Sequence, residues 1–249
     1  MADWDARTYD RIADPLTAMG ARVVERLELR GDELVMDAGC GTGRVTELLA
    51  ERLTGLGPGR VVGVDRSPAM VAEAARRLAR FGDRVELIVA DLADPLPLEP
   101  VVDLVVSTAT FHWIADHQGL FANLFQVLRP GGRLVAQFGG EGNLAGVDRV
   151  LAELGRGGRS PHYESVADTS ERLAKAGFAE VEAGLEAIGV GFDTRADLET
   201  YLRTIILREV VLGVPEPERP ALVAAVAERL PGGRIDYVRL NVSARRPAA

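Results

Sequence analysis

The chain has 249 residues, 47% of them hydrophobic, which is enough to bury one sizeable core. Its formal net charge is −8 at pH 7 and it has no block of Lys or Arg. This argues against a nucleic-acid partner, because phosphate binding needs a basic surface. Cys40 is the only cysteine, so an intrachain disulfide and a cysteine zinc cluster are excluded.

The N-terminal segment, residues 1–30, lacks the apolar run of a signal peptide. No apolar stretch of the chain approaches the ~18 residues that a transmembrane helix requires. We therefore expect a cytoplasmic protein with no membrane partner. Residues 1–30 carry Trp4 and Tyr9 and are predicted to form helices that act as a lid.

Short apolar runs alternate with longer amphipathic runs in the first two thirds of the chain, which is typical of βα units on a parallel sheet. Helices are predicted near Arg44–Leu53, Pro68–Phe81 and His117–Leu128. Ser67 before Pro68 is a helix-start signal, and Pro-Gly-Gly at 130–132 should turn the chain into the fifth strand. The first five predicted strands are Glu33–Met36, Arg60–Val64, Val85–Val89, Asp103–Val106 and Arg133–Phe138.

Residues 141–249 are predicted to complete the sheet. Asp168 and Glu171 fit a capping box for a helix that ends before Gly177, and another helix is expected near Val147–Leu154. The last two strands are placed at Val181–Gly189 and Ile235–Ser243. Between them, a helical insertion at 193–230, with helices at about Ala196–Leu212 and Glu218–Arg229, is a candidate element of a substrate site.

These elements predict an α/β fold in a single domain, 1–249, that is Rossmann-like and doubly wound. Its seven-stranded sheet should be mostly parallel, with an antiparallel last strand. Residues 31–140 should form the core that binds a cofactor.

The glycine loop at 37–43, Asp-Ala-Gly-Cys-Gly-Thr-Gly, is the strongest signal, and it runs from a strand end into a helix start. Glycines there let the backbone approach a ligand closely, and the helix presents unpaired N–H groups. In the G-x-G-x-x-G pattern of dinucleotide sites, Gly39 and Gly41 fit, but Gly43 arrives one residue early. This counts against NAD or FAD, and the absence of a following Lys counts against a P-loop.

Two carboxylates lie where a nucleoside would need them. Asp65 ends the second strand, where it can accept hydrogen bonds from both ribose hydroxyls. Asp91 ends the third strand, where it can accept from an adenine amino group. Both lie at the carboxyl edge of the sheet, where open α/β sheets bind ligands. A purely structural role for Asp37, as an acceptor for loop N–H groups, stays open.

The segments Asp37–Gly43, Asp65, Asp91-Leu92 and Leu128–Gly132 resemble, in order and spacing, the successive motifs of class I S-adenosylmethionine-dependent methyltransferases. The resemblance covers residues 1–140 well and the remainder by strand order. It implies S-adenosylmethionine as cofactor. No metal is expected, because the sequence has no cluster of His, Cys and carboxylates with metal-ligand spacing. The residues that the resemblance implies for the cofactor site are Asp37, Gly39, Gly41, Asp65, Arg66, Met70, Asp91, Leu92 and Ser107.

Within that resemblance, each residue has an implied role. Gly39 and Gly41 would line the methionine portion, and Asp65 would hold the ribose. Arg66 and Met70 would flank the adenine, whose amino group Asp91 would bind. Ser107 would offer backbone beside the reactive sulfonium.

A substrate site is expected around Phe111, His112 and Trp113, which follow the fourth strand. With Trp4 and Tyr9, they resemble the small-molecule branch that methylates free carboxylates, as trans-aconitate and juvenile hormone acid methyltransferases do. The resemblance implies O-methylation of a small-molecule carboxylate. His112 is then a candidate catalytic base, although a carboxylate needs none, and plain packing of the aromatics stays open.

Other functions also stay open on the sequence alone. The acceptor atom could be nitrogen or carbon, as in a natural-product methyltransferase. The chain could also be a non-catalytic adenosyl-binding protein, or an oxidoreductase with an atypical loop.

Overall fold

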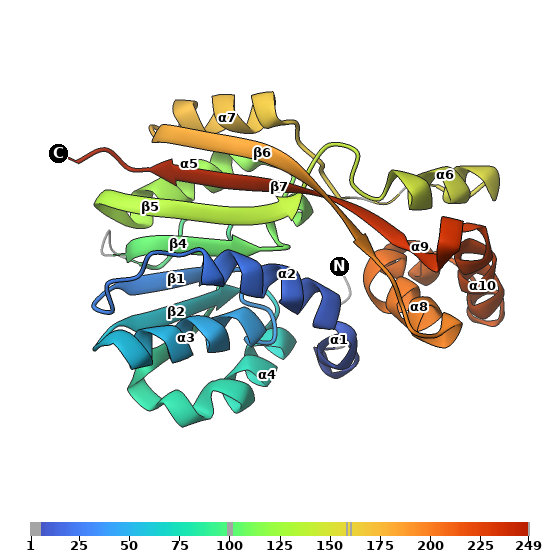
Figure 1. The fold of residues 1–249 in the computed structure, drawn as a ribbon, viewed down its shortest axis with the longest axis horizontal. Coiled ribbons are helices and arrows are strands. Elements are labelled where there is room, and N and C mark those ends of the chain that lie inside the picture. Colours follow the sequence, from blue (N-terminus) through green and yellow to red (C-terminus); the bar gives the residue numbers. More distant parts are fainter. Residues whose placement is uncertain (1–5, 99–101, 158, 160, 249) are drawn as a thin grey trace.

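The computed structural model describes residues 6–98, 102–157, 159 and 161–248. They form one seven-stranded sheet in the order β3-β2-β1-β4-β5-β7-β6, with helices on both faces (Figure 1). Strands β1 to β5 are parallel, and β7 runs antiparallel to both β5 and β6, which confirms the predicted fold class. The strands are β1 (Leu34–Ala38), β2 (Arg60–Asp65), β3 (Val85–Val89), β4 (Val102–Thr108), β5 (Leu128–Gly139), β6 (Ala179–Val190) and β7 (Ile235–Arg245).

The helices follow the predicted alternation with the strands. They are α1 (Ala6–Ile12), α2 (Asp14–Glu25), α3 (Arg44–Leu56), α4 (Pro68–Leu78), α5 (His117–Val127), α6 (Ala145–Glu153), α7 (Val166–Lys175), α8 (Arg195–Tyr201), α9 (Arg208–Leu212) and α10 (Arg219–Arg229). None of the helices among the described residues is both long and apolar enough to cross a membrane.

Alternation along the buried strands divides the core between the two faces of the sheet. Val35 packs with α2 and α3, whereas its neighbour Met36 packs with α5 on the opposite face. A third hydrophobic cluster packs helices α6, α8, α9 and α10 against the beginning of β7. Helices α1, α8 and α9 therefore lie beyond the carboxyl ends of the parallel strands (Figure 1).

The helix starts were predicted with mixed success. The Ser67 side chain accepts a hydrogen bond from the Met70 N–H at 3.2 Å, and α4 begins at Pro68 as expected. The capping box at Asp168 and Glu171 was wrong. Helix α7 begins at Val166, because the Ser165 hydroxyl accepts from the Asp168 N–H at 3.1 Å.

Two predicted elements have a different internal structure. The Pro-Gly-Gly turn lies inside β5, since Val102 pairs with Leu128 and Leu104 with Arg133, which leaves a bulge between them. The helix predicted at Ala196–Leu212 divides into α8, the π-helix Leu202–Ile206 and α9. This π-helical turn borders the cleft described below.

Candidate functional site

The glycine loop after β1 is folded over the end of β2. The N–H groups of Gly39 and Cys40 both donate to the Val64 carbonyl, at 2.8 and 3.0 Å. Gly39 has φ +83°, and an added Cβ would lie 2.2 Å from the Thr110 side chain, so no larger residue fits. At Gly41 an added Cβ would meet no protein atom within 4 Å, so the loop faces open space there.

Asp65 fixes this loop with its carboxylate. Its Oδ2 accepts from the Gly41 N–H and its Oδ1 from the Ser67 N–H, both at 2.9 Å. The Asp65 side chain also lines the cleft. The two buried side chains Met70 and Leu92 add apolar walls beside it.

Asp91 and Arg66 also line this part of the cleft, near its mouth. The Asp91 Oδ1 accepts from the Ala93 N–H at 3.0 Å, and the Arg66 Nη1 lies 3.8 Å from Asp91 Oδ2. Both side chains are about 40% exposed, at 36% and 42%. Of the predicted cofactor residues, the structure thus brings all but Ser107 to one cleft.

Asp37 is buried under the loop, where its Oδ2 accepts from the Thr46 hydroxyl at 2.7 Å. Burial raises the pKa of Asp37 to about 7, and the neighbouring Asp65 carboxylate adds to that effect, while the Thr46 bond opposes it. The carboxyl group therefore changes charge near neutral pH.

We expect this carboxyl group to make the protein less stable as the pH rises from about 4 to about 7. In that window the folded chain holds a proton that the unfolded chain, with an Asp pKa near 3.9, has lost. The free energy of unfolding should fall by about 1–4 kcal/mol relative to an Asp37→Asn variant, which keeps the acceptor for Thr46 but cannot ionise. Urea titrations of both proteins between pH 4 and 8 measure the difference, and parallel curves would contradict it.

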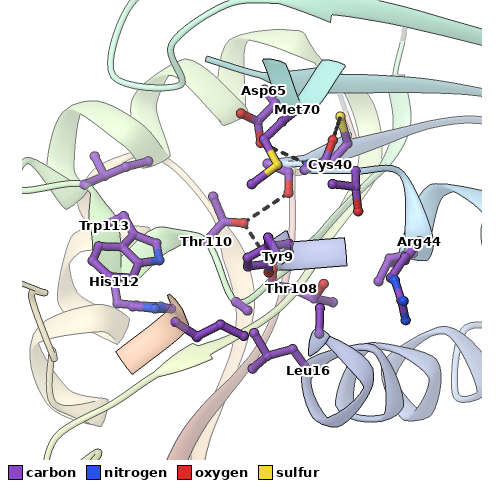
Figure 2. A pocket seen from close by; sticks show the side chains of 18 of the residues that line it. Tyr9, Leu16, Cys40, Arg44, Asp65, Met70, Thr108, Thr110, His112 and Trp113 are labelled. Atoms are coloured by element: carbon purple, nitrogen blue, oxygen red, sulfur yellow. Dashed lines mark hydrogen bonds between the residues drawn. The ribbon is translucent and has the colours of Figure 1, made fainter. Parts of the chain in front are cut away.

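The other half of the cleft holds aromatic and apolar side chains. Figure 2 shows Asp65, Met70 and Cys40 at one end, with His112 and Trp113 at the other. Tyr9 lies between the ends, with Leu16 below it in this view, so that α1 and α2 border the cleft. Burial, with a contribution from Asp65, raises the pKa of Tyr9 to about 12, so its hydroxyl stays a hydrogen-bond donor.

A clasp formed by Asp10 holds α1 in this position. The Asp10 carboxylate accepts from the Thr42 hydroxyl at 2.7 Å, from Arg44 Nε at 3.0 Å and from Arg77 Nη2 at 2.8 Å. Burial opposes ionisation, but the bonds from Thr42 and Arg44 hold the pKa of Asp10 below its usual range. The clasp therefore joins α1 to the glycine loop and to α3 and α4.

His112 is buried beside the Tyr163 and Trp113 rings, with ring centroids 5.9 and 5.2 Å away. Its Nδ1 accepts from the Gly139 N–H at 3.2 Å, so a neutral ring carries its proton on Nε2 and donates from there. Burial holds the pKa of His112 well below its usual range, and the guanidinium groups of Arg239 and Arg159 add to this.

Two predicted site residues do not line the cleft, and a third lies outside the residues that the structure describes. Phe111 lies in the core, fully buried against Phe121 and Phe138, and does not line the cleft. Ser107 is also buried, its hydroxyl bonded to the Ala38 carbonyl at 2.7 Å, and residues 108–110 line the cleft instead. Trp4 lies outside the described residues.

Arg239 on β7 is one of the cleft residues that sequence reasoning missed. Its side chain is 2% exposed, lines the cleft and has no carboxylate within 4.0 Å among the described residues. Its Nε has no hydrogen-bond partner there, and Nη2 makes one long bond, 3.5 Å, to the Gln137 carbonyl. Burial lowers the pKa of Arg239, and the largest opposing effects come from tyrosines.

Arg159 lies in the same half of the cleft but is neutralised. Its guanidinium forms a two-pronged ion pair with Asp148, with N–O distances of 2.9 and 2.8 Å. Its Nη1 donates to the Tyr163 hydroxyl at 2.8 Å. Arg159 is therefore paired with a carboxylate, whereas Arg239 is not.

One sequence signal could have indicated Arg239. Alternate residues of a strand share a face, and Arg239 falls in phase with Ile235 and Tyr237, which are both buried. A charged residue at a buried position of a strand is uncommon unless it is paired or binds a ligand.

The residues that the structure describes contain no group of three or more His, Cys, Asp or Glu side chains placed to hold a metal.

Comparison with known proteins gives a consistent result. A family model described as a methyltransferase domain matches residues 35–132. A trans-aconitate 2-methyltransferase of Methylobacterium nodulans is 36% identical over 193 residues, which cover 78% of this chain and 71% of that protein. One from Delftia acidovorans is 36% identical over 158 residues, or 62% of this chain and 55% of that relative.

Solved structures share the fold. A phosphoethanolamine N-methyltransferase of Haemonchus contortus, solved with phosphomonomethylethanolamine and S-adenosylhomocysteine, has a TM-score of 0.67 at 21% identity. The match covers 97% of this chain and 57% of that one. At this identity the likeness concerns the fold alone.

Proposed function

This chain belongs to the class I S-adenosylmethionine-dependent methyltransferases, and we propose that it methylates a carboxylate oxygen of a small molecule. The observation that carries the proposal is Arg239, a buried guanidinium with no carboxylate partner among the described residues, in the same cleft as the glycine loop. A buried charge is costly unless it is paired. A carboxylate acceptor would supply the missing charge and two hydrogen-bond acceptors for the guanidinium fork.

The other half of the cleft suits the cofactor. We assign the ribose to Asp65, the adenine to Met70, Leu92, Arg66 and Asp91, and the methionine portion to the loop near Gly39 and Gly41. Two features support this fit, namely the open space over Gly41 and the position of the Asp65 carboxylate in the lining of the cleft. The absence of a metal from the reaction stays a prediction from the sequence.

The chemistry asks little of the protein beyond positioning. When bound, the cofactor would supply a methyl group activated by a sulfonium. A carboxylate oxygen of the acceptor would bond to the methyl carbon as the carbon–sulfur bond breaks. The electron pair of the carbon–sulfur bond would stay on sulfur. No proton moves, because a carboxylate with a pKa near 4 is ionised at pH 7. The residues therefore have to orient the acceptor and exclude water.

A product analysis tests the proposal. The purified chain is incubated with methyl-labelled S-adenosylmethionine and a panel of small carboxylic acids, phenols and amines, and the products are treated with alkali. A methyl ester releases labelled methanol, whereas ethers and N- or C-methyl groups keep the label. Label found only in alkali-stable products would overturn carboxylate methylation and favour a nitrogen, carbon or hydroxyl acceptor.

His112 gives a second test, because a positioning role and a general-base role predict different mutants. With Nδ1 engaged by Gly139 and Nε2 as donor, His112 would orient the carboxylate. We expect His112→Ala to raise KM while kcat stays within about tenfold, since no general-base contribution of ~10²–10⁴ is lost. A larger fall in kcat, together with loss of an acidic limb in the pH–kcat profile, would contradict this.

A further inference from the structure

The charges of the cleft are nearly all compensated. Arg44 is paired with Asp10 and Asp14, at 3.0 and 2.6 Å, and Arg159 with Asp148. Arg66 lies beside Asp91, and Arg208 is half-buried and also makes an interaction. In the part of the chain that the structure describes, this leaves Arg239 as the buried cation of the cleft without a carboxylate.

Tyr163 and Tyr237 also line the cleft, but one wall of the acceptor half is apolar. This wall includes Leu16 of helix α2, Ala13 just before that helix, and Leu144 from the segment after β5. The π-helical turn contributes Ile205 and Ile206, which are 6% and 5% exposed. Burying a second charged group against such a surface is strongly unfavourable, because none of these side chains can pair with it.

We propose that the acceptor is a monocarboxylic acid with an apolar body, whose single carboxylate binds Arg239. This inference rests on the proposed function and narrows it. It separates the chain from relatives named for trans-aconitate, an acceptor with three carboxylates. The polar donors of this half, Tyr9, His112 and Trp113, then orient one carboxylate, while the apolar wall receives the remainder of the molecule.

Matched pairs of acids test how many carboxylates the acceptor carries. Octanoate and octanedioate differ by a carboxylate at the far end, as do 3-phenylpropanoate and its 4-carboxy derivative. We expect kcat/KM for ester formation to be at least about a hundredfold higher for the monoacid of a productive pair, and trans-aconitate to be as poor as the diacids. The monoacids should also raise the thermal midpoint of the chain saturated with S-adenosylhomocysteine, and the diacids should not.

An engineered second cation gives the converse test. Leu16 is half-buried on α2 and lines the cleft, so Leu16→Arg would place a guanidinium in the apolar wall. The ratio of diacid to monoacid turnover should rise at least about tenfold in this variant. Leu56→Arg adds the same charge at an exposed position of α3 outside the cleft and, as matched control, should keep the preference of the parent.

The outcomes separate this inference from the proposed function. Esters formed faster from trans-aconitate or the diacids than from any monoacid would overturn the inference and leave carboxylate methylation intact. Label found only in alkali-stable products would overturn both. If no acid is esterified and no monoacid raises the thermal midpoint, the inference is likewise wrong.

Discussion

Replacing Arg239 with methionine should lower kcat/KM for the acid acceptor by about 10²–10⁴-fold and leave the affinity for S-adenosylmethionine within about threefold. The change removes two charge-assisted hydrogen bonds to the carboxylate, at ~1.5–3 kcal/mol each. Methionine keeps much of the unbranched stem, so the packing around β7 changes little. Steady-state kinetics and calorimetric titration with S-adenosylhomocysteine measure the two quantities separately.

The same substitution should leave stability unchanged or raise it. In the protein without ligands the guanidinium is buried without a counter-charge, and its Nε has no partner among the described residues. The thermal midpoint of Arg239→Met should therefore equal or exceed that of the parent, as is common where function requires a destabilised site. Arg239→Lys, which keeps the charge without the planar fork, should retain intermediate activity. Full activity in Arg239→Met would place the acceptor elsewhere.

Asp65→Ala should weaken cofactor binding by about a hundredfold or more. At the proposed ribose position it would remove a carboxylate that accepts from two ribose hydroxyls, at ~1.5–3 kcal/mol per charged bond. It also leaves the N–H groups of Gly41 and Ser67 without their acceptor, which loosens the loop itself. Asp65→Asn should be milder, but the amide nitrogen would face one of these two donors, so it restores only part of the binding.

A matched control for this variant is Glu86→Ala on the neighbouring strand β3. Glu86 is exposed and does not line the cleft, so its removal changes the net charge equally without touching the site. Calorimetry with S-adenosylhomocysteine compares the two variants. An affinity of Asp65→Ala within about threefold of the parent would contradict the assigned ribose position, since a loss of charged bonds allows no such result.

The cofactor half of the site could be predicted from the sequence because its residues are local to strand ends. Asp37, Asp65 and Asp91 each follow an apolar run, and parallel strands bring their carboxyl ends to one edge regardless of loop details. Strand ends were placed to within two residues for β2 and β3 for the same reason. The glycine spacing then indicated the class of ligand.

The acceptor half could not be predicted in this way, because its residues come from distant segments. Arg239 reaches the cleft through the antiparallel pairing of β7 with β5, and Arg159 through a loop that carries no periodicity. Phe111 was wrongly predicted to line the site. It shares a segment with His112 and Trp113, but the short 3₁₀ turn at 111–113 directs it into the core. Local sequence pattern does not determine which side of such a turn faces a cavity.

The Asp10 clasp has a kinetic consequence. Helix α1 has seven residues, and isolated helices shorter than ~12–15 residues are marginal in water. Once the bonds from Thr42, Arg44 and Arg77 to Asp10 break, α1 is held mainly by the packing of Tyr9 and Ile12 against the cluster around α8–α10. We therefore expect product departure past Tyr9 to proceed through local unfolding of α1 rather than the swing of a rigid lid. Its rate should rise with ionic strength, and amide hydrogen exchange within residues 6–12 should report the same opening.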